Sequence, residues 1–242
     1  MKNLTKAELF KLKKSTAYRT LFIIFLLTEI IVQINNIGNS VAYPKYNPTY
    51  TGIGWLSELH RPFSIYAITL FLFAAFFVNG DFTGRTFYAS LLCGTERKNA
   101  FGAKMISVFA GGVPLALVSL LPGTILWSIH TGFGMDFGIK AAFLIIKAFV
   151  WQILISFAII SHTVFFAVIA KSKTSTFVWS FGSLYVVGVL RANIGRIIPN
   201  PALGEILKFL VSLYYLNIWT FLASVLLKLL AAGYIFEKFD LK

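Results

Sequence analysis

Long apolar runs separated by short polar stretches dominate the pattern along the chain. Six runs come close to the roughly 20 residues that a membrane-crossing helix needs: about 19–37, 63–79, 105–129, 145–170, 174–190 and 215–236. The fourth and fifth runs are separated by so few residues that they predict a helical hairpin with a tight turn at 171–174. The pattern therefore predicts one all-α transmembrane domain, residues 1–242, with six spans.

Composition supports this prediction. Hydrophobic residues make up 57% of the chain and charged residues 13%, against about 45–50% and 25% in soluble domains. A soluble protein has no place for so much apolar surface, so we expect the excess to face lipid. The same composition excludes disordered, collagen-like, coiled-coil and disulfide-rich proteins, and the single cysteine, Cys93, forbids an intrachain disulfide.

The basic residues predict the orientation in the membrane. A formal charge of +13 would suggest nucleic acid binding in a soluble protein, but here it is first a topology signal, and we expect no nucleic acid partner. Of the 22 Lys and Arg residues, fourteen lie near the N-terminus, in 80–104, at 171–173 and near the C-terminus, and seven fall on the opposite side of the predicted spans. Both termini are therefore expected in the cytoplasm.

The loops differ in what they predict. Residues 38–62 and 191–214 fall outside the cell, and 191–214 is expected to be a re-entrant or interfacial segment. Residues 1–18 are basic, with Lys2, Lys6 and Lys13 on one helical face. This stretch is either a surface helix held by anionic headgroups or a basic tail that only sets topology.

Ionisable residues inside the predicted spans give a further hypothesis. Glu29 and Lys228 each lie roughly 13–15 Å from the cytoplasmic end of their runs, at 1.5 Å per residue. Buried charges in lipid usually face a partner or a wet cavity, so we predict a Glu29–Lys228 pair between the first and sixth spans. His162, within the fourth run, is expected to be a packed or hydrogen-bonded helix residue.

Catalytic signatures are not apparent in the sequence. The chain has no G-x-x-x-x-G-K-[ST] phosphate loop and no H-E-x-x-H motif, and its three histidines lie in separate regions. We therefore expect no enzyme activity, no metal site and no cofactor site in this chain.

The cytoplasmic loop 80–104 is longer than a simple connection requires. It predicts a short helix over 86–93, a break at Gly94-Thr95, and a second helix capped by Thr95. A surface helix with mixed aromatic and charged residues is suited to docking on a cytoplasmic partner, although a solvated connector would show a similar pattern.

The same loop resembles the ABC-2 type permeases of ATP-binding-cassette transporters. The matching positions are an acidic residue, a Gly-Thr-like pair, a leucine-containing helix, and a small residue with Arg before a Lys-led third span. Here they are Asp81, Gly84-Arg85-Thr86, Leu91-Leu92, Thr95-Glu96-Arg97-Lys98 and Lys104. The chain departs from the family in having Asp for the commoner Glu and Arg between Gly and Thr. Residues 1–18 resemble the family's cytoplasmic elbow helix, and 233–242 resemble its C-terminal ending.

The resemblance implies a function. Members act as permease subunits: two permeases and two separate cytoplasmic ATPase subunits, which bind ATP and Mg²⁺, form an exporter in the bacterial plasma membrane. Residues 86–99 would be the coupling helix that carries motion from the ATPase to the spans. The chain looks most like permeases for antimicrobial-peptide immunity and export, of the lantibiotic-protection, bacitracin-resistance and phenol-soluble-modulin types, so the expected substrate is an amphipathic or hydrophobic peptide. Two alternatives remain open: a non-transporting peptide-immunity or sensor protein, and an ion-gradient-driven secondary transporter.

Overall fold

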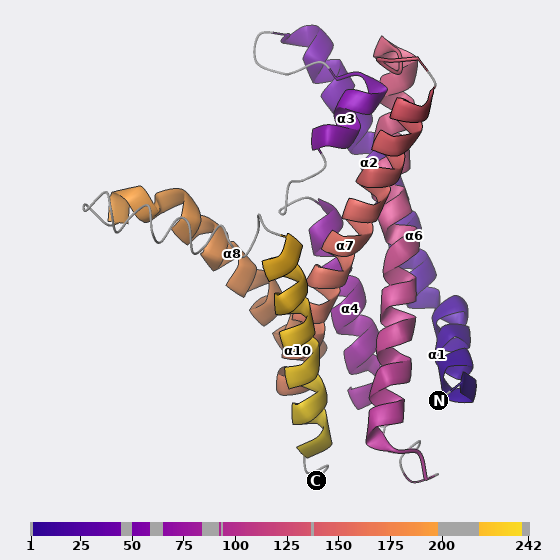
Figure 1. Ribbon diagram of the computed structural model, residues 1–242, viewed down its shortest axis with the longest axis vertical. Helices are drawn as coiled ribbons and strands as arrows, with labels where there is room; N and C mark the ends of the chain where they lie inside the picture. The colour runs from indigo at the N-terminus through magenta and orange to yellow at the C-terminus, as the bar shows by residue number, and fades with distance from the viewer. Residues whose placement is uncertain are drawn as a thin grey trace. The chain divides into compact units, whose positions relative to one another are not determined.

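The computed structural model describes residues 2–44, 50–58, 65–83, 92, 94–136, 138–197 and 218–238. Its regular elements there are all helices, which confirms the all-α fold class for the described part of the chain (Figure 1). They are α1 (Lys2–Lys14), α2 (Thr16–Ala42), α3 (Gly52–Glu58), α4 (Ile65–Thr83), α6 (Arg97–Thr131), α7 (Ile139–Ala170), α8 (Lys173–Ile197) and α10 (Ile218–Lys238).

Three of these helices are long and apolar enough to cross a membrane: α2, α6 and α7. Within α4, Ile65–Asp81 is a shorter apolar helix. A backbone in hydrocarbon must satisfy its own hydrogen bonds, and a helix of this length does so. The structure thus supports a membrane protein, while the six-span count and the cytoplasmic termini stay predictions.

The helices extend past the apolar runs that predicted them. α6 has 35 residues, which corresponds to about 52 Å, whereas the hydrocarbon core is about 30 Å thick. If α6 crosses the membrane with its apolar run at the centre, its first residues, including Arg97 and Lys98, lie beyond the apolar layer. α2 follows α1 after the single residue Ser15, whose hydroxyl caps α2 by accepting from the Tyr18 backbone N–H at 3.2 Å.

The chain forms two compact units. The first contains residues 1–4, 74–105 and 158–242, and the second contains 5–73 and 106–157. α1, α4, α6 and α7 each contribute residues to both.

In the second unit, α2 packs on a proline-containing part of α6. Pro114 and Pro122 lie inside α6, and the helix continues through both. The Tyr18 hydroxyl donates to the Gly111 carbonyl at 2.8 Å, one turn before Pro114. Pro114 has no N–H to donate to the Ala110 carbonyl, so this bond from α2 supports α6 next to the point where its backbone ladder is interrupted.

The short helix α3 lies in the 38–62 loop, where no helix was predicted. Its first N–H groups donate to the carbonyls of Gly132 and Phe133, at 3.1 and 3.0 Å. Trp55 of α3 packs on Gly123 so closely that an added Cβ would lie 2.0 Å from the indole nitrogen. A glycine is therefore required at position 123 for α3 to pack on α6 in this way.

In the first unit, polar side chains connect neighbouring helices. Asn79 of α4 donates to Thr176 of α8 at 2.8 Å. His162 of α7 is buried, and its Nε2 lies 2.9 Å from the Ser183 hydroxyl of α8. This confirms His162 as a packed, hydrogen-bonded helix residue. The tight turn predicted between the fourth and fifth runs is also confirmed, because α7 ends at Ala170 and α8 begins at Lys173.

Candidate functional site

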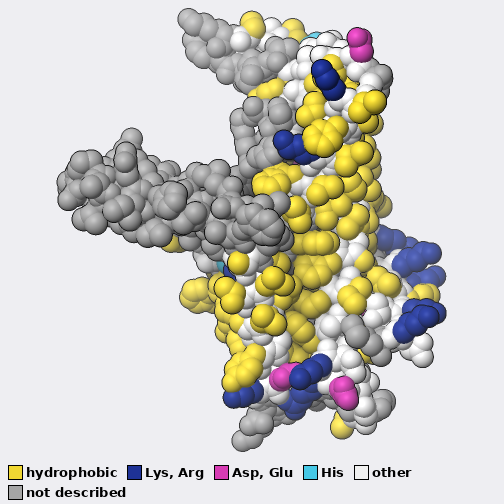
Figure 2. Space-filling model, viewed as in Figure 1, with side chains coloured by type: hydrophobic (Ala, Val, Ile, Leu, Met, Phe, Trp, Pro, Cys, Tyr) yellow, Lys and Arg dark blue, Asp and Glu magenta, His cyan; other side chains and the backbone are white. Residues whose placement is uncertain are grey.

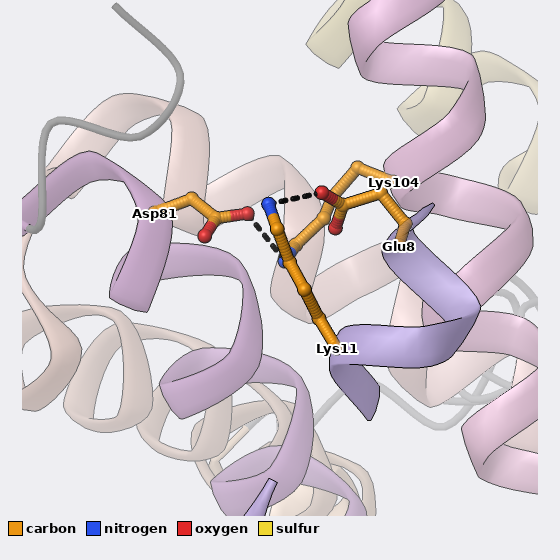
Figure 3. Close-up of polar contacts among 4 residues, drawn as sticks. All are labelled: Glu8, Lys11, Asp81 and Lys104. Atoms are coloured by element: carbon orange, nitrogen blue, oxygen red, sulfur yellow. Dashed lines mark hydrogen bonds and ion pairs between the residues drawn. The ribbon is translucent and has the colours of Figure 1, made fainter. Parts of the chain in front are cut away.

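A buried ion pair joins the two helices that flank the 84–96 segment. Asp81 lies in the last turn region of α4, and Lys104 lies two turns into α6. The Lys104 Nζ is 2.6 Å from the Asp81 carboxylate (Figure 3), and it also lies 3.6 Å from the centre of the Phe77 ring. The Lys104 side chain is only 2% exposed. The contacts fix α4 and α6 together immediately beside the segment that connects them.

The beginning of α6 is also joined to the end of α10. The Arg97 guanidinium donates to the Glu237 carbonyl at 2.8 Å, and the Lys98 ammonium lies 3.3 Å from the Glu237 carboxylate. One turn inward, the rings of Phe101 and Phe236 pack with centroids 5.4 Å apart. Cations near a helix C-terminus also interact favourably with its carbonyl groups. We call Asp81, Arg97, Lys98, Lys104 and Glu237 the ionic cluster.

The start of α6 differs by one position from the sequence prediction. Gly94 adopts a φ of +83°, a left-handed backbone that an α-helix does not contain, and residues 94–96 are not helical, as the predicted break at Gly94-Thr95 requires. α6 begins at Arg97, and the Glu96 carbonyl accepts from the Ala100 N–H at 3.0 Å. Glu96 therefore takes the cap position that was predicted for Thr95. The Asn99 side chain donates to the Glu96 carboxylate at 2.9 Å, which favours this start.

Several predicted coupling residues lie outside the described residues. These are Gly84, Arg85, Thr86 and Leu91, together with most of the predicted 86–93 helix. Leu92 is described: it is helical and 88% exposed. Glu96 and Lys98 are exposed as well. The described part of the loop thus exposes one apolar side chain and two charged groups.

The predicted intramembrane pair remains a prediction, because Glu29 belongs to the second unit and Lys228 to the first. Glu29 is buried and its side chain hydrogen-bonds Gln33, one turn further along α2. Gln33 in turn lies 3.4 Å from the Trp127 indole N–H, which connects α2 to α6. Lys228 interacts electrostatically with His162. Glu29 therefore has a hydrogen-bonding neighbour within its own unit, and Lys228 has a titratable neighbour within its own unit.

Sequence reasoning identified the positions of Asp81 and Lys104 but not their pairing, and it missed Phe77 and the Glu237 contacts. The available signal was an acid at the end of one helix and a lysine near the start of the next. Within the described ranges, no three His, Cys, Asp or Glu side chains gather into a group that could hold a metal ion. Compared with known proteins, the chain matches no family model, no curated protein and no solved structure.

Proposed function

We propose that this chain is the permease subunit of an ATP-driven exporter of the ABC-2 type, with residues 86–99 as the coupling segment. The observation that carries the proposal is the Asp81–Lys104 ion pair, which fixes α4 to α6 at the two sides of that segment. The resemblance of these residues to the family motif supports the same role.

The ionic cluster suits the transmission of motion. A partner that moves the coupling segment would move a unit in which α4, α6 and α10 are joined by charged contacts. Packed helices move as rigid bodies, and small displacements at one end are carried along their length. In contrast, a solvated connector does not need a lysine buried against an aspartate and an aromatic ring.

The remaining parts of the proposal follow from the family. The chain would span the bacterial plasma membrane six times with both termini inside, and a second permease copy would complete the translocation path. ATP and Mg²⁺ would be bound by a separate ATPase subunit. The substrate class would be amphipathic or hydrophobic peptides, exported from the cell or cleared from its membrane. The uncharged and aromatic character of the apolar helices suits such peptides better than ions or sugars.

Co-purification from the native membrane in mild detergent, followed by mass spectrometry, tests the proposal. A stoichiometric P-loop ATPase is expected with the unaltered chain. The variants Leu92→Glu and Glu96→Ala should reduce its retention, because both side chains are exposed in the coupling segment. Met135→Glu, an exposed position between α6 and α7, is the matched control and should retain the ATPase.

Two outcomes would contradict the proposal. One is the absence of any ATPase from folded, purified protein. The other is equal retention by all three variants together with unchanged peptide-stimulated ATP hydrolysis. Either result would favour the peptide-sensor or ion-driven alternatives, which predict no dependence on residues 86–99.

A further inference from the structure

One face of α1 carries cations around an exposed aromatic ring. Lys6, Lys13 and Lys14 are exposed, and Phe10 keeps 61% of its surface accessible. At about 100° per helical residue, the three lysines lie within roughly 60° of Phe10 around the helix axis. We call these four residues the basic face. Dark-blue side chains gather over α1 in Figure 2.

The opposite side of α1 is packed. Leu12 and Glu8 are 7% and 6% exposed. The Lys11 ammonium lies 2.5 Å from the Glu8 carboxylate, as Figure 3 shows. Glu8 is the only acidic residue in α1, and it lies about 160° from Phe10 around the axis. The basic face therefore presents positive charge that no carboxylate of its own helix offsets.

The connection to α2 places this face directly beside the first predicted span. Only Ser15 separates the two helices. The Arg19 guanidinium donates to the Lys14 carbonyl at 2.9 Å, and this hydrogen bond connects the end of α1 to the first turn of α2. α2 has 27 residues, or about 40 Å, close to the 40–45 Å thickness of a bilayer with its headgroups. If α2 crosses the membrane, its first turn lies at headgroup level. Lys13 and Lys14 are then only a few ångströms further along the chain.

We propose that the basic face binds the anionic phospholipid headgroups of the leaflet in which α2 begins. The lysine ammoniums would contact lipid phosphates, while the Phe10 ring would rest at the boundary between headgroups and acyl chains, as aromatic residues do in interfacial helices. Each lysine near an anionic surface strengthens binding roughly fivefold, equivalent to about 1 kcal/mol. The proposal does not depend on the ATPase partner, so it can fail or hold independently of the proposed function.

The first test measures the depth of α1 in vesicles. A nitroxide is attached to Phe10→Cys of the full-length chain in a Cys93→Ser background, and its collisions with oxygen and with a water-soluble nickel chelate are compared. Adding phosphatidylglycerol to phosphatidylcholine vesicles should raise oxygen accessibility and lower nickel accessibility. The triple change Lys6→Gln, Lys13→Gln, Lys14→Gln should abolish this dependence. A matched change at two exposed lysines of α7, Lys140→Gln with Lys147→Gln, should preserve it.

The second test leaves Phe10 and Cys93 unchanged. Thermal unfolding of the detergent-purified protein is followed with added short-chain phosphatidylglycerol, short-chain phosphatidylcholine or inorganic phosphate. Phosphatidylglycerol alone should raise the midpoint, and the triple variant should lose this response while unfolding at the wild-type midpoint without lipid. If the triple variant does not fold, Lys13→Gln and Lys14→Gln should each weaken the response roughly fivefold.

Three results would overturn the proposal. Equal stabilisation by phosphatidylcholine would show that lipid charge plays no part. Equal stabilisation by inorganic phosphate would indicate a soluble-anion site instead of a lipid surface. An undiminished phosphatidylglycerol response in the lysine variants would show that the lipid binds elsewhere on the chain.

Discussion

The Asp81–Lys104 pair gives the sharpest test of the ionic cluster. Asp81→Asn keeps the shape of the side chain but removes the carboxylate that neutralises Lys104. Lys104→Met keeps most of the apolar stem but removes the ammonium. The double variant removes both charges. Because the two groups are unequally buried, the two single variants are expected to differ.

The structure sets the expected magnitudes. Lys104 has a side chain only 2% exposed, so Asp81→Asn leaves a cation out of reach of bulk water; losing one partner of a buried pair costs about 3–5 kcal/mol. The Asp81 side chain is 15% exposed, so water can partly solvate the carboxylate after Lys104→Met, and we expect a loss of about 2 kcal/mol. The double variant should lie within about 1 kcal/mol of wild type, because it removes both charges of the buried pair together.

Thermal unfolding of the detergent-purified variants measures these differences. For a chain of this length, 1 kcal/mol shifts the midpoint by about 2–4 °C, so Asp81→Asn should lower it by about 6–20 °C. Lys98→Gln is the matched control: it breaks a pair with side chains 77% and 36% exposed, which is worth less than about 1 kcal/mol. Additive losses in the double variant, or a larger loss for Lys104→Met than for Asp81→Asn, would refute the reasoning.

Two further predictions concern packing and the intramembrane charges. Gly123→Ala should destabilise the protein by about 1–3 kcal/mol, because its Cβ would overlap Trp55. The control Gly38→Ala should be neutral or stabilising, because nothing lies within 4 Å of its Cβ. An equal drop in the thermal unfolding midpoint of both variants would contradict this prediction. If Glu29 and Lys228 form a pair, Glu29→Gln and Lys228→Met should each lower the midpoint and the double variant should lose less than their sum. Strict additivity would exclude the pair.

The sequence predicted part of the candidate site. The acid at 81, the glycine break at 94 and the lysine at 104 could all be found from the motif, because each is a residue type with a positional preference. The pairing of Asp81 with Lys104 could not, since 23 positions separate them and the helix ends that bring them together were displaced from the predicted limits. The hydrogen bond from Arg97 to the Glu237 carbonyl could not be predicted either, because its acceptor is a backbone atom and a pattern of side chains does not reveal such a contact.

At the level of the fold, the sequence by itself determined the helical class and where helices such as α2, α6 and α7 lie. The reason is that a long apolar backbone in lipid must satisfy its hydrogen bonds internally, and only a helix does so within one segment. Tertiary structure alone decided which faces meet, as in the packing of Trp55 on Gly123 and the bond from Tyr18 to Gly111. A helix that is apolar all round has no polar stripe to set its rotation, so close packing and a few buried polar contacts set it instead.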